Sequence, residues 1–305
     1  MTVVELIRPF VALSLILTIA APADAWYQGR DPAPGRAPGE VLIENGNGRC
    51  SGVFISRRHI LTAGHCVYLQ RHLFRKLEYR DPSPLFAFLD IFPSYNVRSL
   101  KWWNDNETLG KSQDTENVYV HPSNSAYLGS PEQLDRQLAF IGDGADRQIY
   151  DLAVIELKQA WNLPFVRVRP APLAVGELVD AGGHGRKSLD SDGADDMLFT
   201  TSRAKVSRQL AHLNRLSTTD AETRRESFAL SGDSGGPVYS TDPKTGEIEL
   251  AGIMALGEGQ DSFLGILVST SGSEAVRLDQ STPAYAWIQG VLGGRERPTV
   301  VGAEW

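Results

Sequence analysis

The sequence predicts an all-β protein, a sandwich or a barrel built from short strands. Short runs rich in valine, isoleucine and other β-forming residues recur along most of the chain. Clusters of Gly, Pro, Asp and Ser separate these runs, as in sandwiches and barrels. The composition is that of a globular protein, since 42% of the 305 residues are hydrophobic. A chain of this length and composition can bury a substantial core.

The predicted strands follow one another closely. They lie at residues 41–43, 50–55, 59–63, 118–120, 152–157, 177–181, 199–206, 237–239, 248–254 and 264–269. The first two are separated by Asn45-Gly46-Asn47-Gly48, a sequence typical of a tight hairpin turn. One helix is expected at residues 283–292, where apolar residues recur at helical spacing between Pro283 and Gly293.

Three segments do not fit this scheme of short strands. Residues 26–40 are rich in Pro and Gly and read as an extended lead segment. Residues 68–117 and 124–149 are long for connections between strands, and residues 131–140 have a weak helical pattern. These two long segments are either functional insertions or contain elements that the pattern does not resolve.

The first 25 residues are predicted to be a secretory signal peptide. An apolar run at residues 10–21 follows a short leader and precedes the small-residue triplet Ala23-Asp24-Ala25, with cleavage expected after Ala25. The apolar run is too short to cross a membrane, which takes about 20 residues. We therefore expect a secreted or periplasmic protein with no membrane association once the signal is removed.

Charge and acidic clusters argue against several classes of partner. The formal net charge is −7, which disfavours nucleic acid or an anionic membrane surface as a partner. Asp190, Asp192, Asp195 and Asp196 form an acidic cluster, but without the spacing of a calcium loop. We expect no metal and no cofactor.

The two cysteines, Cys50 and Cys66, are expected to form a disulfide. An even pair in an oxidising compartment usually does so. The alternative, a zinc site, lacks the paired Cys-x-x-Cys spacing that structural zinc sites use.

The segment from Ser231 to Pro237 has the features of a loop that presents a nucleophilic serine. Three glycines surround Ser234, so the backbone can bend sharply and neighbouring N–H groups can converge on one point. The pattern Gly-x-Ser-x-Gly also fits the nucleophile elbow of α/β-hydrolases, in which the catalytic histidine follows the serine. All six histidines precede Ser234: His59, His65, His72, His121, His184 and His212. The order that remains is histidine, aspartate, serine.

His65 is the best candidate for a general base. It follows an apolar strand and adjoins Cys66, whose bridge would fix the position of the imidazole. Asp151 stands directly before the apolar strand at 152–157, where a carboxylate could orient a histidine. Taken alone, an aspartate at this position is more often a turn residue. The other five histidines are expected to be surface or core residues.

Three motifs, in this order, resemble the trypsin/chymotrypsin-like serine peptidases. They are CSGVFISRRHILTAGHC at residues 50–66, DLAVIEL at 151–157 and GDSGGP at 232–237, with weaker similarity at 120–122, 181–185 and 285–291. The resemblance implies two packed antiparallel β-barrels with the active site between them and a short C-terminal helix. The implied domains are an N-terminal barrel at 41–165, a C-terminal barrel and helix at 166–292, and a tail at 293–305.

The resemblance also implies a function and roles for individual residues. Ser234 would be the nucleophile, His65 the base and Asp151 the residue that orients it, while the N–H groups of Gly232 and Ser234 would form the oxyanion hole. The protein is then expected to be an exported serine endopeptidase that acts on proteins or peptides through an acyl-enzyme. A catalytically silent binding protein and an esterase are the alternatives.

Two features depart from the family pattern. Phe228 stands at the base of the specificity pocket, which argues against Lys or Arg specificity. With Ala255, Leu256 and Gly257 along the wall, we expect preference for an apolar or small residue. Leu230 replaces a half-cystine of the family's pocket.

The second departure concerns Asp233, which in the family pairs with a newly formed amino terminus. No Ile-Val-Gly-Gly string is present to supply that terminus. We expect signal cleavage before Trp26 to supply it, with cleavage after Arg30 or Arg36, or an arginine side chain, as alternatives.

Overall fold

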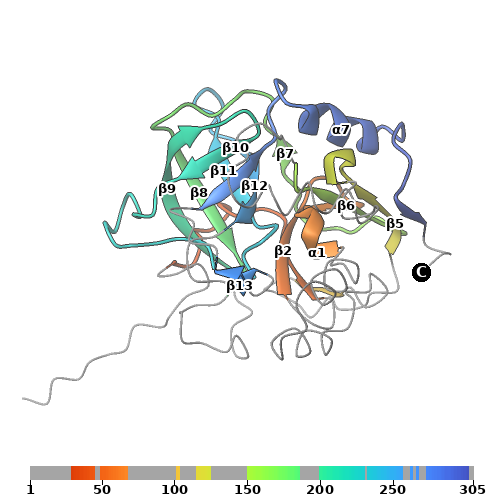
Figure 1. Ribbon diagram of the computed structural model, residues 1–305, viewed down its shortest axis with the longest axis horizontal. Coiled ribbons are helices and arrows are strands. Elements are labelled where there is room, and N and C mark those ends of the chain that lie inside the picture. Colours follow the sequence, from red (N-terminus) through yellow and green to blue (C-terminus); the bar gives the residue numbers. More distant parts are fainter. Residues whose placement is uncertain are drawn as a thin grey trace, which may run out of the picture.

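Two seven-stranded β-sheets contain most of the strands in the described part of the protein (Figure 1). The computed structural model describes residues 29–44, 49–67, 101–103, 115–124, 150–185, 199–230, 232–256, 262–263, 266–267 and 273–301. The all-β prediction and the double-barrel architecture with a short C-terminal helix are both confirmed. The predicted signal peptide, the calcium-like acidic cluster and most of the two long segments lie outside the described residues.

The first sheet has seven strands in the order β16-β5-β6-β3-β2-β1-β4, all antiparallel to their neighbours. The strands are β1 (Glu40–Glu44), β2 (Arg49–Phe54), β3 (His59–Thr62), β4 (Lys101–Trp103), β5 (Thr115–Val120), β6 (Ala153–Leu157) and β16 (Val300–Val301). The pairing of Glu44 with Arg49 confirms that β1 and β2 are successive antiparallel neighbours, as a hairpin requires.

The second sheet closes into a six-stranded barrel, because β11 pairs with both β8 and β12. Its order is β11-β8-β9-β10-β15-β12, and β7 is added outside β12 in parallel orientation. The strands are β7 (Arg167–Val168), β8 (Leu178–Gly183), β9 (Thr200–Gln209), β10 (Leu213–Leu216), β11 (Pro237–Thr241), β12 (Ile248–Leu256) and β15 (Glu274–Arg277). A separate ribbon pairs β13 (Ser262–Phe263) with β14 (Ile266–Leu267).

A common apolar core joins the two sheets. One cluster of buried side chains combines Leu61 and Val154 from the first sheet with Tyr239 and Ile253 from the second. Each sheet also has an apolar cluster of its own. Because this cluster contains side chains of both sheets, it packs the two sheets against each other.

The predicted C-terminal helix is present as α7 (Pro283–Leu292) and packs on the common core. Proline occupies its first turn, where a missing N–H does no harm. Ala284, Trp287, Ile288 and Val291 are buried along one face, at the spacing of an amphipathic helix. Among the described residues, no helix is long and apolar enough to cross a membrane.

After α7 the chain returns to the first sheet (Figure 1). The N–H of Thr299 donates to the carbonyl of Val118 at 2.8 Å, and its hydroxyl accepts from the N–H of Val120 at 2.9 Å. Part of the segment predicted as a tail thus forms the edge strand β16.

The described part of the lead segment, residues 29–40, runs along the second barrel. Arg30 and Thr201 exchange two backbone hydrogen bonds of 2.9 and 2.8 Å. Farther along, the Tyr239 hydroxyl donates to the carbonyl of Pro38 at 3.0 Å. The segment therefore reaches β1 along the surface of the second barrel.

Candidate active site

The pairing of β3 with β6 brings His65 and Asp151 together. Thr62, the last residue of β3, is the direct partner of Ala153, the first residue of β6. His65 lies just beyond β3 in the short helix α1 (Gly64–Val67), and Asp151 lies just before β6. In an antiparallel pair these two positions are at the same end of the sheet. The two predicted residues are therefore neighbours although 86 positions separate them.

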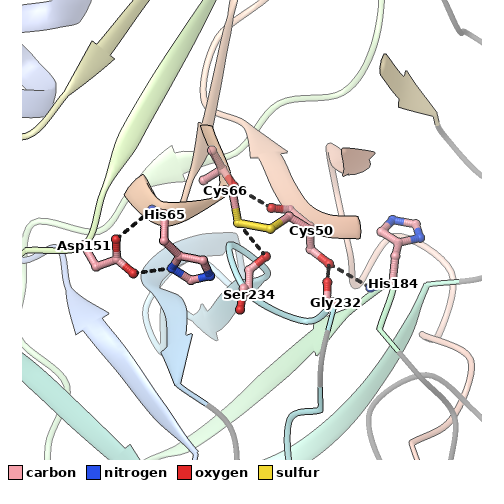
Figure 2. Close-up of a disulfide and its surroundings, with 9 residues drawn as sticks. Cys50, His65, Cys66, Asp151, His184, Gly232 and Ser234 are labelled. Carbon is pink, nitrogen blue, oxygen red and sulfur yellow. Dashed lines mark hydrogen bonds and ion pairs between the residues drawn. A yellow bond between two sulfur atoms is a disulfide. The ribbon is translucent and has the colours of Figure 1, made fainter. Parts of the chain in front are cut away.

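Asp151 contacts His65 through both of its carboxylate oxygens (Figure 2). Oδ1 accepts the backbone N–H of His65 at 3.0 Å, and Oδ2 lies 2.6 Å from Nδ1 of the ring. The two side chains are only 14% and 15% exposed. Burial by itself lowers the pKa of His65, but the charge of Asp151 and the hydrogen bond to it outweigh burial, so the pKa is raised.

The predicted disulfide is present between Cys50 and Cys66, with their Cα atoms 6.0 Å apart. A ring nitrogen of His65 and the two sulfurs lie within 4.8 Å of one another. These three residues do not form a zinc site, since both sulfurs are used in the disulfide and neither is a thiolate. The bridge ties β2 to α1 and so fixes the backbone directly after His65.

Ser234 lies on the side of the His65 ring opposite Asp151 (Figure 2). The Ser234 carbonyl accepts the N–H of Ser51 at 2.7 Å and lies 3.6 Å from the sulfur of Cys66. The loop that carries Ser234 is therefore fastened to β2, beside the disulfide.

Glycine is required at two positions next to Ser234. Gly232 has φ +99° and Gly235 has φ +82°, the left-handed region that other residues avoid. A Cβ atom at Gly235 would lie 2.1 Å from the carbonyl oxygen of Ser51, and one at Gly232 would lie 2.7 Å from the Cα of Gly185. The glycines recognised in the motif thus allow a tight loop to pack directly on neighbouring backbone.

Asp233 is completely buried beneath this loop. Oδ1 accepts the N–H of Gly185 at 2.9 Å, and Oδ2 accepts the N–H of Leu230 at 2.8 Å. A Cβ atom at Gly183 would lie 2.4 Å from Oδ1, so this part of the β8 end is also close to the carboxylate. Backbone N–H groups of this kind stabilise a buried carboxylate.

The residues expected to form a specificity pocket are buried where their side chains are described. Phe228 and Ala255 are 6% and 7% exposed, and Leu230 is buried as well. Leu256 is the last residue of β12, and Gly257 lies outside the described residues.

The residues behind the Ser234 loop were given no role from the sequence, although they lie in the segments 50–66 and 181–185 that resemble the family. Ser51, His184 and Gly185 each donate or accept a hydrogen bond with that loop or with one another. For Ser51 a signal existed, since a polar residue within a buried strand needs a partner.

The similarity of this chain to known proteins extends over most of its length. A sequence model of the family described as Trypsin matches residues 27–272. The chain belongs to the trypsin family. The mouse (Mus musculus) protein named Mannan-binding lectin serine protease 1 is 21% identical over 292 residues, which cover 88% of this chain and 35% of the relative. This trypsin-family chain therefore spans about a third of that relative's length.

Proposed function

We propose that this trypsin-family protein is an exported serine endopeptidase with Ser234 as its nucleophile. The observation that carries the proposal is the arrangement of Asp151, His65 and Ser234, with the imidazole between the carboxylate and the serine. A buried carboxylate, an oriented histidine and a serine on a tight glycine loop together make up the machinery of acyl transfer.

The proposed reaction begins with attack of the Ser234 hydroxyl oxygen on the carbonyl carbon of a peptide bond. The Nε2 atom of His65 takes the hydroxyl proton, while Asp151 holds the Nδ1–H tautomer and stabilises the imidazolium. His65 then gives the proton to the leaving amine, and an ester to Ser234 remains. Water, deprotonated by His65, hydrolyses this acyl-enzyme and restores the serine.

The negative charge that forms on the carbonyl oxygen would be stabilised by the N–H groups of Gly232 and Ser234. Fixed donors that point at the developing charge contribute strongly, and loss of one costs about 10²–10³ in rate. The raised pKa of His65 supports the same mechanism, since it reflects an environment that stabilises the imidazolium.

The proposed substrate has an apolar or small residue before the scissile bond. Phe228 is buried and brings no charge to the base of the pocket, while Ala255 is a small buried residue of β12. A pocket lined in this way would leave a Lys or Arg side chain without a counter-ion. The natural substrate is proposed only at this level, as a protein or peptide.

We propose further that the amino terminus formed by signal cleavage pairs with Asp233. Arg30 is bonded to Thr201, and Thr201 is the partner of Gly182 in β8, which places Arg30 about two strand spacings, or about 10 Å, from Gly182. Four extended residues span about 13 Å, so a terminus at Trp26 would be within reach of the carboxylate.

Covalent labelling with a fluorophosphonate tests the proposed function. The secreted protein is treated with the reagent and its intact mass is compared with that of Ser234→Ala. We expect one adduct on the wild type and none on the variant. Absence of labelling in a folded protein with the mature amino terminus would indicate a silent binding protein.

A second assay separates the peptidase from the esterase. The fluorophosphonate-labelled protein and the untreated protein are each assayed for hydrolysis of a peptide library and of small apolar esters. Hydrolysis of both supports the proposal, whereas hydrolysis of the esters alone would contradict it. Sequencing of the amino terminus of the exported protein tests cleavage after Ala25.

A further inference from the structure

Ser51 contacts the Ser234 loop from within β2, in the other sheet. It is fully buried and follows the disulfide residue Cys50. Its hydroxyl oxygen lies 2.9 Å from the carbonyl oxygen of Gly232 and 2.8 Å from the backbone nitrogen of His184. Gly232 and His184 are both labelled in Figure 2, on the side of Ser234 away from Asp151.

The direction of these two hydrogen bonds is fixed by chemistry. A backbone N–H can only donate, so the Ser51 oxygen accepts the bond from His184. A carbonyl oxygen can only accept, so the single hydroxyl proton of Ser51 goes to Gly232. The hydroxyl therefore acts as a donor to Gly232 and as an acceptor from His184.

The backbone of Ser51 holds a second carbonyl of the same loop. Its N–H donates to the carbonyl of Ser234 at 2.7 Å. One residue of β2 thus binds the carbonyl groups of Gly232 and Ser234, and these are the two residues whose N–H groups would form the oxyanion hole.

The bond to Gly232 matters because glycine rotates easily. Without a Cβ atom, a glycine can exchange between backbone conformations that turn its N–H in different directions. The carbonyl of Gly232 lies in the peptide group that joins Gly232 to Asp233, so the Ser51 bond fixes Gly232 from its carboxyl side. The N–H of Asp233, in the same peptide group, donates to the carbonyl of Leu230 at 3.0 Å. Rotation of this peptide group would leave the hydroxyl proton of Ser51 and the carbonyl of Gly232 buried without partners, which is costly. The close approach of Gly232 to Gly185 limits the alternatives further.

We propose that Ser51 is a positioning residue of the oxyanion hole: its hydroxyl holds Gly232 in the conformation that points its N–H at the developing charge. This inference rests on the proposed peptidase function. Ser51 touches no reacting atom, so its effect would appear in the stabilisation of the transition state rather than in the binding of substrate.

The test is Ser51→Ala, compared with a matched buried serine. Ser202 in β9 is also buried and donates its hydroxyl to Asp220 at 2.9 Å, far in sequence from the Ser234 loop. We expect Ser51→Ala to lower kcat at least tenfold with KM unchanged. The affinity for a phenylalkyl boronic acid, which forms a tetrahedral adduct on the serine, should fall by a similar factor. Ser202→Ala should change neither quantity.

Rates are expressed per site titrated with the fluorophosphonate, so that a partly unfolded preparation still reports kcat. Ser51→Gly removes the same hydroxyl and serves as the second variant. Unchanged kcat and boronate affinity in Ser51→Ala, with only a lower unfolding midpoint, would overturn this inference and leave the proposed function standing. If the mature wild-type protein is not labelled by the fluorophosphonate and hydrolyses no substrate, the proposed function is wrong. This inference then fails with it.

Discussion

Asp151 binds His65 at two points, the backbone N–H through Oδ1 and the ring Nδ1 through Oδ2. The first bond fixes the position of the His65 backbone relative to β6, and the second fixes the ring. A histidine held in this way presents Nε2 in one direction only, which is what a general base requires. The same carboxylate also raises the pKa of His65 against the effect of burial.

The pH dependence of activity should follow from that raised pKa. Only neutral His65 can take the serine proton, so kcat/KM is expected to rise with pH along a limb whose midpoint lies above 6.5, the ordinary histidine value. In Asp151→Asn burial acts alone, and the midpoint should move below the wild-type value while kcat falls by about 10⁴. Rates measured from pH 5 to pH 9 check this. A limb at the same pH in both proteins would contradict the prediction.

Removal of the disulfide should reduce both stability and activity. The bridge closes a loop across a sequence separation of 16, and its loss from Cys50→Ala/Cys66→Ala should lower the free energy of unfolding by about 3 kcal/mol. Because Cys66 adjoins His65, the labelling rate of the folded variant should fall as well. Urea denaturation and labelling of the two proteins provide the measurements. Equal stability in both would show that the bridge does not constrain the chain.

Acid should destabilise the protein through His121. This side chain is 6% exposed, packs against Tyr150 and Trp287, and burial lowers its pKa to about 4. Between pH 6.5 and 4 the unfolded state binds a proton that the folded state does not, so stability falls as the pH falls. Through this one residue, the free energy of unfolding should fall by about 3 kcal/mol over this pH range. Urea denaturation at pH 7 and pH 4 should show a smaller loss for His121→Gln than for the wild type.

The proposed pairing of Asp233 with the amino terminus predicts sensitivity to both groups. Asp233→Asn should reduce the labelling rate at least tenfold, and so should one extra residue before Trp26. Asp180→Asn is the control, because Asp180 is a half-buried carboxylate of β8 that pairs with Arg203. Full activity in a protein with a blocked or extended terminus would exclude the pairing.

The parts of the fold that sequence predicted are those with strong local signals. The loop of Ser234 was recognisable by its glycines, which the structure needs because two of them have positive φ. The strand β6 was recognisable because all but one of its residues are apolar, and these apolar residues are buried. The Cys50–Cys66 bridge followed from the count of two cysteines together with the expected export of the protein.

Other strands were missed because their sequences look like loops. In β15, Glu274 and Arg277 are buried charged residues that pair with Arg215 and Asp279. Buried charged residues occur in a strand only when residues elsewhere in the chain neutralise them. The local sequence does not show such partners, so the segment looks like a loop. The same reason explains Ser51, whose hydroxyl partner Gly232 is 181 positions away.

The return of the chain to β5 has a consequence for the order of folding. Thr299 and Val120, which are bonded to each other, are 179 positions apart, and the whole second barrel lies between them in the sequence. The first sheet therefore acquires β16 only after the chain of the second barrel has been synthesised. Contacts of such long range slow folding, because the entropy of closing the loop is lost before the contact forms. The edge of β5 stays open for that interval, and its exposed N–H and C=O groups are free to pair with other chains.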